Sequence, residues 1–280
     1  MTKFLLNNFM VEEHVKAALK EDIGYGDIST DFLCSDEDII KANLNTRENG
    51  ILSGIDVFCT VFRILNSNIQ IKTFFKDGDE IKKGDKIAEI EGSARGILTG
   101  ERTALNYIQR MSGIATETDK YQKAIVPYKA KIADTRKTTP NFRMFEKYSV
   151  KVGGGALHRF NLSDCVMLKD NHISFAGNIE NAVKKVRENI SHAHKIEVEC
   201  DTKEQVKQAL SAGADIIMLD NMSVEDMKYC VNIINGCAVV EASGNVKLET
   251  VKEIAATGVD IISSSAIVAK APTLDIALDM

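Results

Sequence analysis

The sequence predicts an α/β protein whose second half is built from parallel βα units. From Lys131 onward, short β-branched and apolar runs alternate with amphipathic stretches of helical spacing. This alternation is typical of a parallel sheet covered by helices. The first third of the chain differs, because strand-like alternation there is mixed with separate helical patterns, which indicates an α+β domain.

Six strands are predicted in succession after residue 130, with four helices between them. The strands span residues 131–136, 165–170, 195–200, 215–220, 238–243 and 259–264, and the helices residues 178–189, 202–213, 223–235 and 247–258. Thr202 and Ser223 stand where helix N-caps belong, and Gly213 and Gly258 stand where helices end. Six strands in a row favour a barrel over an open sheet, although periodicity alone leaves both open.

The first domain is predicted to cover residues 1–110 and the barrel domain residues 111–270. Helices are expected at 11–20, 55–66 and 97–121, and strands within 41–54, 69–79 and 85–92. The last segment, 271–280, is expected to form a helix that packs back on the first domain.

Composition narrows the class of protein. Of the 280 residues, 44% are hydrophobic, and the net charge is −5 with a pI near 5.7. An acidic chain without a basic stripe is not typical of nucleic-acid binders. Its apolar runs are interrupted by charge and its first residues lack a signal-peptide core, so a cytoplasmic protein is expected. The six cysteines form no CxxC or zinc pattern and are expected to be buried thiols.

The segment from Ile132 to Ile173 concentrates cations on this acidic chain. It contains Arg136, Lys137, Arg143, Lys147, Lys151, His158, Arg159, Lys169 and His172. A small and strongly anionic ligand, bound by forked guanidinium and point-charge ammonium donors, would explain such a concentration. The three glycines at 153–155 lack the GxGxxG spacing, so a flexible loop is favoured there over a phosphate cradle.

Polar residues end the predicted strands, where barrel enzymes carry their chemistry. The ends are Arg136-Lys137, Lys169-Asp170, Glu199, Asp220, Ser243-Gly244-Asn245 and Ser263-Ser264-Ser265. The cations suit carboxylates and phosphates, and the last two loops suit phosphate. The carboxylates of Glu199 and Asp220 accept hydrogen bonds and donate none. They suit Mg²⁺, sugar hydroxyls or a developing positive charge. The set indicates an anionic substrate that meets a metal-bound phosphosugar.

Each residue alone has a plainer interpretation. A single Arg or Lys at a strand end is usually a solvated charge, and Glu199 could be a structural partner of Lys169. His158 could be a core histidine, and His172 could form strand-end hydrogen bonds. The functional interpretation depends on the joint pattern.

The chain resembles the quinolinate phosphoribosyltransferase family nearly end to end. The resemblance is carried by EDIGYGDIST (21–30), GERTALNYIQRMSGIAT (100–116), ADTRKTTP (133–140), EKYSVKVGGGALHRFNLSDCVMLKDNHI (146–173), IEVEC (196–200), IIMLDNM (216–222), EASGNV (241–246) and GVDIISSSAI (258–267). It implies an N-terminal α/β sandwich domain joined to an incomplete, six-strand α/β barrel of TIM-like type. It also implies a homodimer in which Arg102 reaches the partner's site.

The family implies a pentosyltransferase of NAD biosynthesis, which converts quinolinate and phosphoribosyl pyrophosphate into nicotinate mononucleotide, pyrophosphate and CO₂ with Mg²⁺. By resemblance, quinolinate is bound by Arg136, His158, Arg159 and Lys169, completed by Arg102 from the partner, with Lys137 near the reacting centre. Thr135 is implied as a further substrate-binding residue. Glu199 and Asp220 resemble the acidic pair near the ribose, as indirect ligands of Mg²⁺. Phosphate contacts are implied for Ser243, Gly244, Asn245, Ser263, Ser264, Ser265 and Ala266.

The chain departs from the family pattern at a few positions. Leu157 stands where Asn is common, Asn161 lies near a usual Gly, and Ser265 replaces another Gly. Residues 268–269 are Val-Ala where Thr-His is common. Asn245 replaces the second Gly of a Ser-Gly-Gly turn, and because Asn tolerates positive φ, the turn is expected to survive.

Two other kinds of function stay open. Family relatives linked to molybdenum transport, and phosphoribosyltransferases that take nicotinate, have other substrates. The intact His158-Arg159 pair and Lys169 favour a dicarboxylate instead. A non-catalytic binding protein would be expected to lose the acidic pair, yet Glu199 and Asp220 are both present.

Overall fold

The computed structural model describes residues 6–280, and the chain divides into two compact units. The first unit extends to Asp119 and also includes Met144–Gly154 and Ala271–Met280, and the second comprises Lys120–Arg143 and Gly155–Lys270. The first domain was predicted to end at residue 110, with segment 271–280 packing back on it. The further return of the chain at Met144–Gly154 is not visible in a pattern read in sequence order.

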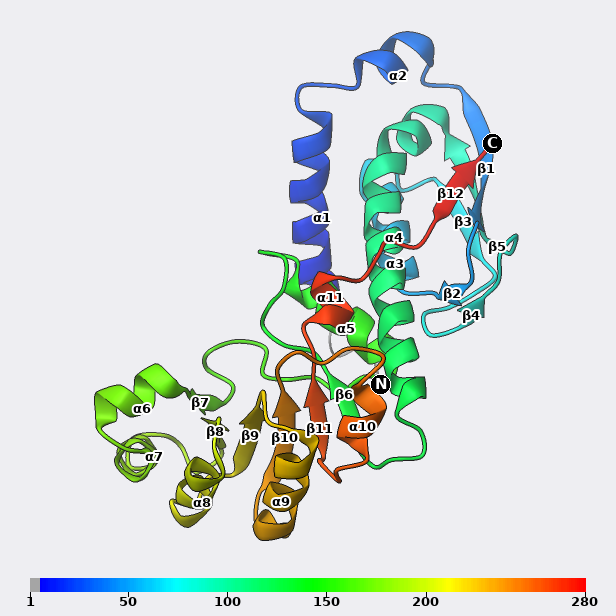
Figure 1. Ribbon diagram of the computed structural model, residues 1–280. Coiled ribbons are helices and arrows are strands. Elements are labelled where there is room, and N and C mark those ends of the chain that lie inside the picture. Colours follow the sequence, from blue (N-terminus) through cyan, green and yellow to red (C-terminus); the bar gives the residue numbers. More distant parts are fainter. Residues whose placement is uncertain (1–5) are drawn as a thin grey trace. The chain divides into compact units, whose positions relative to one another are not determined.

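The first unit contains a four-stranded antiparallel sheet in the order β12-β1-β5-β3 (Figure 1). The strands are β1 (Ile39–Thr46), β3 (Gln70–Thr73), β5 (Lys86–Ser93) and β12 (Ile276–Asp279), and β2 (Gly50–Ile51) pairs with β4 (Glu80–Ile81). The helices are α1 (Asn8–Ile23), α2 (Ile28–Leu33), α3 (Ile55–Leu65), α4 (Ala94–Ala124) and α5 (Arg143–Val152). The predicted mixture of strands and helices is present.

The C-terminal segment forms a strand, so the prediction of a helix at 271–280 is wrong. β12 pairs with β1, with Ile276 opposite Thr46 and Leu278 opposite Leu44. Leu274 and Ile276 are buried while Asp275 between them is exposed. This alternation of buried and exposed residues fits a strand at a sheet edge. The segment is too short for the alternation to be distinguished from helical spacing in the sequence.

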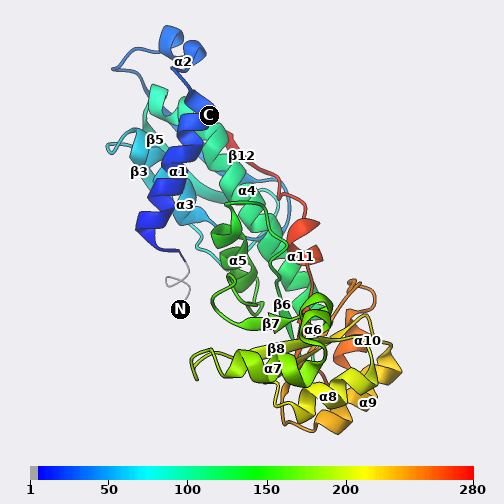
Figure 2. The ribbon, with the colours of Figure 1, turned by 90° about the vertical axis from the view of Figure 1, so that its left-hand side faces the viewer.

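The second unit is a six-stranded parallel sheet in the order β6-β11-β10-β9-β8-β7, with helices following the strands on its outer side (Figure 2). The strands are β6 (Lys131–Ala133), β7 (Val166–Leu168), β8 (Ile196–Cys200), β9 (Ile216–Asp220), β10 (Val239–Ser243) and β11 (Ile261–Ser263). The helices are α6 (Asp170–Ala176), α7 (Ile179–Arg187), α8 (Lys203–Ser211), α9 (Val224–Ile234), α10 (Val251–Ala255) and α11 (Ala266–Ala269).

All six predicted strands of this unit are confirmed, as are both predicted N-caps. The Thr202 side chain accepts from the Gln205 N–H, and the Ser223 side chain accepts from the Asp226 N–H. Among the described strands, β6 and β7 are not paired with each other, so the barrel is incomplete. The C-terminal strand ends gather the residues discussed below on one rim of the sheet.

The glycine run at 153–155 does not begin as a flexible loop. Gly153 N–H donates to Ser149 O, which continues the last turn of α5. A Cβ on Gly153 would overlap the Ala115 carbonyl oxygen of α4. Glycine is therefore required because two helices of the first unit approach closely here.

The six cysteines are all free thiols, as expected, but they are not all buried. Cys59, Cys200 and Cys230 are buried, whereas Cys237 is exposed in the turn between α9 and β10. Burial raises the pKa of the Cys59 thiol to about 11. Among residues 6–280, no helix combines the length and the apolarity that a membrane span requires.

Candidate functional site

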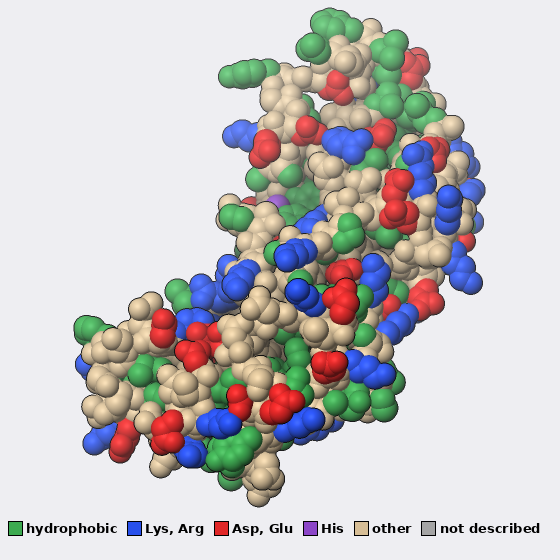
Figure 3. All heavy atoms as spheres, viewed as in Figure 1, with side chains coloured by type: hydrophobic (Ala, Val, Ile, Leu, Met, Phe, Trp, Pro, Cys, Tyr) green, Lys and Arg blue, Asp and Glu red, His purple; other side chains and the backbone are tan. Residues whose placement is uncertain are grey.

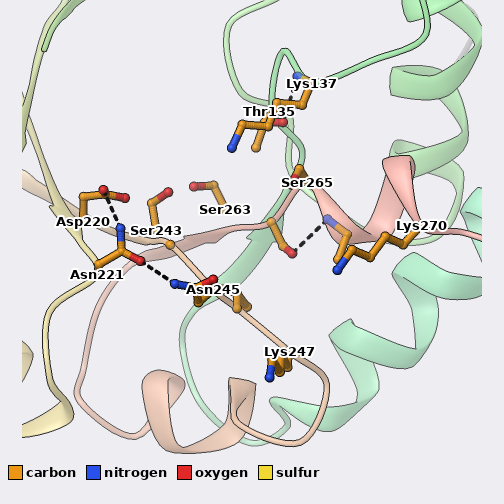
Figure 4. A pocket seen from close by; sticks show the side chains of 14 residues that line it. Thr135, Lys137, Asp220, Asn221, Ser243, Asn245, Lys247, Ser263, Ser265 and Lys270 are labelled. Carbon is orange, nitrogen blue, oxygen red and sulfur yellow. Dashed lines mark hydrogen bonds between the residues drawn. The ribbon is translucent and has the colours of Figure 1, made fainter.

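A polar pocket of about 340 Å³ lies at the C-terminal ends of four strands of the second unit (Figure 4). It is lined by Thr135 and Lys137 after β6, Asp220 and Asn221 after β9, the loop Ser243–Lys247 after β10, and Ser263, Ser264, Ser265, Ala266 and Lys270 after β11. Parallel strands present their carboxyl ends to the same edge of a sheet, which brings these distant segments together.

Hydrogen bonds fix the β9 and β10 ends of this pocket. Asp220 lies opposite Ser243 in the strand register. The Asn221 side chain donates to Asp220 Oδ2 at 2.8 Å and accepts from Asn245 Nδ2 at 2.9 Å (Figure 4). Asn245 has φ +51°, so the expected survival of this turn is confirmed. Gly244 must remain glycine, because its φ is +91° and a Cβ would overlap the Asn221 side chain.

The opposite wall presents hydroxyl groups and ammonium groups. Ser263 is only 3% exposed, and its Oγ has no hydrogen-bond partner among the described residues. Lys137 N–H donates to Thr135 Oγ1 at 3.0 Å, which shapes the turn after β6. Lys247 and Lys270 add two further cations to the lining. Hydroxyls and ammonium groups around one carboxylate suit a phosphorylated sugar.

A cluster of guanidinium groups follows β6. Burial lowers the pKa of Arg136, and the neighbouring charges of Arg159 and Arg143 lower it further. Arg136 Nε is buried with no hydrogen-bond partner among the described residues. Arg143 is held in place, since its Nε donates to Thr138 Oγ1 at 2.9 Å and its Nη1 donates to Phe160 O at 3.1 Å. Like charges beside an unsatisfied N–H form a site that an anion would complete.

Lys169 and Glu199 form an ion pair across the ends of β7 and β8. The Glu199 side chain is 17% exposed and the Lys169 side chain 44% exposed, so the pair borders solvent. His172 has the structural position expected for it, because its Nδ1 accepts from the Lys169 N–H at 3.0 Å. Lys169 therefore has its backbone fixed by His172 and its ammonium by Glu199.

A second cavity of about 370 Å³ lies nearer the N-terminal ends of the strands. His158 and Arg159 line it, together with Glu197 on β8 and Glu241 on β10. His158 Nε2 lies 3.3 Å from Glu197 Oε2 and 3.5 Å from Glu241 Oε1. Burial raises the pKa of the Glu241 carboxyl to about 7, and the neighbouring Glu197 acts in the same direction.

Two models of one protein family together match almost the whole chain. The model of the quinolinate phosphoribosyl transferase N-terminal domain matches residues 27–112, and that of the C-terminal domain matches residues 114–279. The chain belongs to the quinolinate phosphoribosyl transferase family.

Relatives of this transferase match it along almost its whole length. A probable nicotinate-nucleotide pyrophosphorylase (carboxylating) of Bacillus subtilis is 40% identical over 278 residues, which cover 99% of this chain and 93% of the relative. The crystal structure of NadC from Streptococcus pyogenes is 41% identical with a TM-score of 0.95, covering 98% and 97% of the two chains. The nicotinate-nucleotide pyrophosphorylase of Francisella tularensis is 42% identical with a TM-score of 0.94 and the same coverage.

The transferase fold brings most of the predicted site residues together in the second unit. The 340 Å³ pocket gathers Thr135, Lys137, Asp220, Ser243, Gly244, Asn245, Ser263, Ser264, Ser265 and Ala266. Arg136 lies in the guanidinium cluster with Arg159, while Lys169 and Glu199 pair with each other. His158 and Arg159 line the second cavity and not the first. Arg102 lies on α4 of the first unit with an exposed side chain.

Arg143 was among the cations noted in the sequence, whereas four other residues at or near the site of this transferase were not predicted. Lys247 and Lys270 are cations that lie beyond a strand end, and Glu197 and Glu241 are acidic residues within strands. Glu197 and Glu241 did carry a signal. A charged residue in the middle of an otherwise apolar strand faces the barrel interior and needs a partner there.

Proposed function

We propose that the chain catalyses phosphoribosyl transfer to quinolinate, as a pentosyltransferase of NAD biosynthesis. Quinolinate and phosphoribosyl pyrophosphate would give nicotinate mononucleotide, pyrophosphate and CO₂. Family membership and the names of the relatives, which are nicotinate-nucleotide pyrophosphorylases, support this reaction. The observation that carries it is the hydroxyl-lined pocket at the C-terminal strand ends, where Arg136 stands in the chain between the lining residues Thr135 and Lys137.

The guanidinium cluster accounts for a dianionic substrate. Arg136 has a buried Nε that no described residue accepts from, and two further arginines stand close to it. A planar carboxylate can accept two parallel N–H bonds from one guanidinium. Arg136, Arg159 and Lys169 would hold the two carboxylates of quinolinate, with Arg102 supplied by a second subunit.

The hydroxyl-lined pocket accounts for the phosphosugar. Thr135, the Ser243-Gly244-Asn245 turn and the segment 263–266 would bind phosphate and ribose oxygens through backbone N–H and hydroxyl groups. Lys137 lies nearest to the guanidinium cluster along the chain and would stand at the reacting centre. Lys247 and Lys270 line the same pocket and would neutralise phosphate charge. Such cations matter here because Val268-Ala269, where Thr-His is common in the family, offers no side-chain donor.

The reaction then follows from positioning and electrostatics. The pyridine nitrogen donates its lone pair to the anomeric carbon while the bond to pyrophosphate breaks. Positive charge develops on the ribose, and Asp220 and Glu199 would stabilise it. In the resulting pyridinium, the bond to the adjacent carboxylate breaks, CO₂ leaves, and the electron pair left on the ring carbon takes up a proton. No covalent enzyme intermediate is required.

Mg²⁺ is proposed as the cofactor, and Asp220 is the residue that fits it best. One Asp220 oxygen accepts from Asn221, which leaves the other oxygen on the pocket side. Glu199 fits less directly, because Lys169 already occupies its carboxylate. Mg²⁺ usually combines one or two carboxylates with water and substrate phosphates. Bound with the pyrophosphate, it would neutralise charge on the leaving group.

Product analysis tests this function against its closest alternative. The purified protein would be incubated with phosphoribosyl pyrophosphate and Mg²⁺, with either quinolinate or nicotinate as the base. We expect nicotinate mononucleotide and equimolar CO₂ from quinolinate, and no nucleotide from nicotinate. Turnover of nicotinate alone would move the protein to a non-decarboxylating activity, and turnover of neither base would reject both.

We also propose a homodimer that works in the cytoplasm. Large apolar side chains gather on and just before α2, where Tyr25, Ile28, Phe32 and Leu33 are exposed (Figure 3). An apolar patch of this kind marks a surface for association. The six free thiols fit a reducing compartment.

A further inference from the structure

Three buried side chains inside the barrel form a cluster that the proposed reaction does not use directly. His158, Glu197 and Glu241 come from three separate segments, and their side chains are 9%, 1% and 6% exposed. His158 Nε2 faces an oxygen of each carboxylate, at 3.3 Å and 3.5 Å. Glu197 Oε1 is buried with no hydrogen-bond partner among the described residues, and Glu241 Oε1 is the oxygen that faces His158. Buried polar atoms are usually satisfied, so this cluster calls for an explanation.

The hydrogen bonds of His158 decide its tautomer. Its Nδ1 accepts from the Arg159 N–H at 2.7 Å, so Nδ1 carries a lone pair and no proton. The ring proton is then on Nε2, where it points between Glu197 and Glu241. Both ring nitrogens are committed within the chain, which leaves neither of them to donate to a substrate carboxylate.

The same tautomer argues against a metal ion in this cluster. Two carboxylates and an imidazole have the number and type of ligands that a transition metal accepts. A metal-bound Nε2 would require the proton on Nδ1, whereas Nδ1 accepts from a backbone N–H. The cluster therefore holds an imidazole N–H between two acceptors.

This imidazole is fixed to a segment that carries a proposed substrate ligand. The Asp134 side chain accepts from the His158 N–H at 2.8 Å, and Ala156 bridges to Ala133 beside β6. Arg159 is held twice, by its N–H on His158 Nδ1 and by Nη1 on Cys165 O at 2.9 Å. The ring of His158 thus connects the interior strands β8 and β10 with the backbone of Arg159.

We propose that Glu197 and Glu241 are positioning residues that hold His158 as the Nε2–H tautomer and, through it, place Arg159 for the carboxylates of quinolinate. The inference rests on the proposed function for its last step only. His158 accordingly acts as a positioning residue and not as a direct ligand of the substrate.

Nitrogen NMR of the wild-type protein, with its histidine rings labelled, tests the tautomer without any activity. The chain has five histidines, and the His158 signals are identified by their loss in His158→Asn. We expect a neutral ring with the proton on Nε2. A neutral ring with the proton on Nδ1, an imidazolium, or a bound metal found by elemental analysis would overturn the proposal.

Kinetics of paired variants test the positioning. Glu197→Leu and Glu241→Leu combined in one chain remove both acceptors, whereas Glu197→Gln and Glu241→Gln combined in the same way keep two amide oxygens for Nε2–H. We expect the leucine double variant to raise the KM for quinolinate about tenfold, because an unsatisfied buried donor costs roughly that factor. The KM for phosphoribosyl pyrophosphate should stay unchanged, and the glutamine double variant should retain the wild-type KM values.

The control is Met218→Leu, a buried β9 residue that lies opposite Glu241 in the register and carries no acceptor. It should leave both KM values unchanged. A leucine double variant with the wild-type KM for quinolinate, or a glutamine double variant as impaired as the leucine double variant, would contradict the positioning role. A wild-type protein that does not turn over quinolinate would reject the proposed function, while the NMR result would still decide the tautomer.

Discussion

Arg136 shows which features mark this site at the level of single residues. Its Nε is buried without a partner among the described residues, and two other guanidinium groups lower its pKa further after burial. Buried polar groups are normally satisfied, so such exceptions indicate where a ligand supplies the missing bonds.

Arg136→Ala should raise the KM for quinolinate about 100-fold, because hydrogen bonds to charged groups contribute about 1.5–3 kcal/mol each. The KM for phosphoribosyl pyrophosphate should change by less than about threefold, within the effect of a distant surface charge. Arg187→Ala is the control, since that arginine pairs with Asp215 at 2.6 Å outside the cluster. Steady-state kinetics with each substrate varied would show the difference. Equal rises in both KM values would contradict the proposed division of the site.

Glu241 gives the stability a defined pH dependence. Burial and Glu197 raise its pKa in the folded protein to about 7, above the value of 4.5 expected when unfolded. A raised folded pKa means that the stabilisation is complete below pH 4.5 and is lost as the pH rises through about 7.

Glu241→Gln should therefore be more stable than the wild type at pH 8 and of similar stability at pH 5, with a difference at pH 8 on the order of a few kcal/mol. Urea unfolding at both pH values measures it, with the exposed Glu249→Gln as control. A wild type more stable to urea than Glu241→Gln at pH 8 would show that the pKa of the Glu241 carboxyl is not raised.

At the scale of elements, close packing of α5 on α4 depends on a single glycine. Gly153→Ala should destabilise the first unit by about 1–3 kcal/mol, because its Cβ has no room beside the Ala115 carbonyl oxygen. Gly177→Ala is the control, since its φ of +91° is strained but no atom lies within 4 Å of the added Cβ. Thermal unfolding should rank Gly153→Ala as the less stable. The reverse order would show that α5 can move away from α4.

The elements of the second unit were predictable because each carries its own local signal. β-branched runs, N-caps such as Thr202, and glycines at helix ends all agree along the chain. The rim residues followed from the same pattern, because carboxyl ends of parallel strands share an edge. Asn245 could also be foreseen, since its tolerance of positive φ is a property of the residue itself.

The remaining features depend on partners that are distant in the sequence. β12 is a strand because β1 offers it an edge, and Gly153 is required because α4 lies against it. The inward direction of Glu197 and Glu241 depends on barrel curvature, and the ring orientation of His158 depends on a backbone bond to Arg159. Local periodicity carries no information about such contacts.

At the scale of the whole molecule, we propose that two subunits share each site. The purified protein should have twice the chain mass of 30.8 kDa by light scattering. Ile28→Glu on the apolar face of α2 should shift it toward the monomer, because a charge there opposes burial. A monomer at working concentration would contradict the shared site.

Mixing two variants at a quinolinate concentration where each alone has little activity tests Arg102 directly. In a dimer of one Arg102→Ala chain and one Arg136→Ala chain, one of the two sites would have both arginines. Random reassociation of equal amounts should therefore restore about one quarter of the wild-type activity. Two copies of the same variant, reassociated in the same way, are the controls. If activity did not recover although mixed dimers had formed, Arg102 would lie outside the partner's site.

In the proposed reaction the rim of the barrel joins quinolinate to a phosphosugar, and pyrophosphate release measures that step. The protein would be supplied with phosphoribosyl pyrophosphate and Mg²⁺, with and without quinolinate, beside an Asp220→Asn control. We predict release that requires quinolinate and Mg²⁺, and that falls at least about tenfold in the control, because a carboxylate at the developing charge is lost. If quinolinate caused no pyrophosphate release at any substrate concentration, the proposed function would be contradicted.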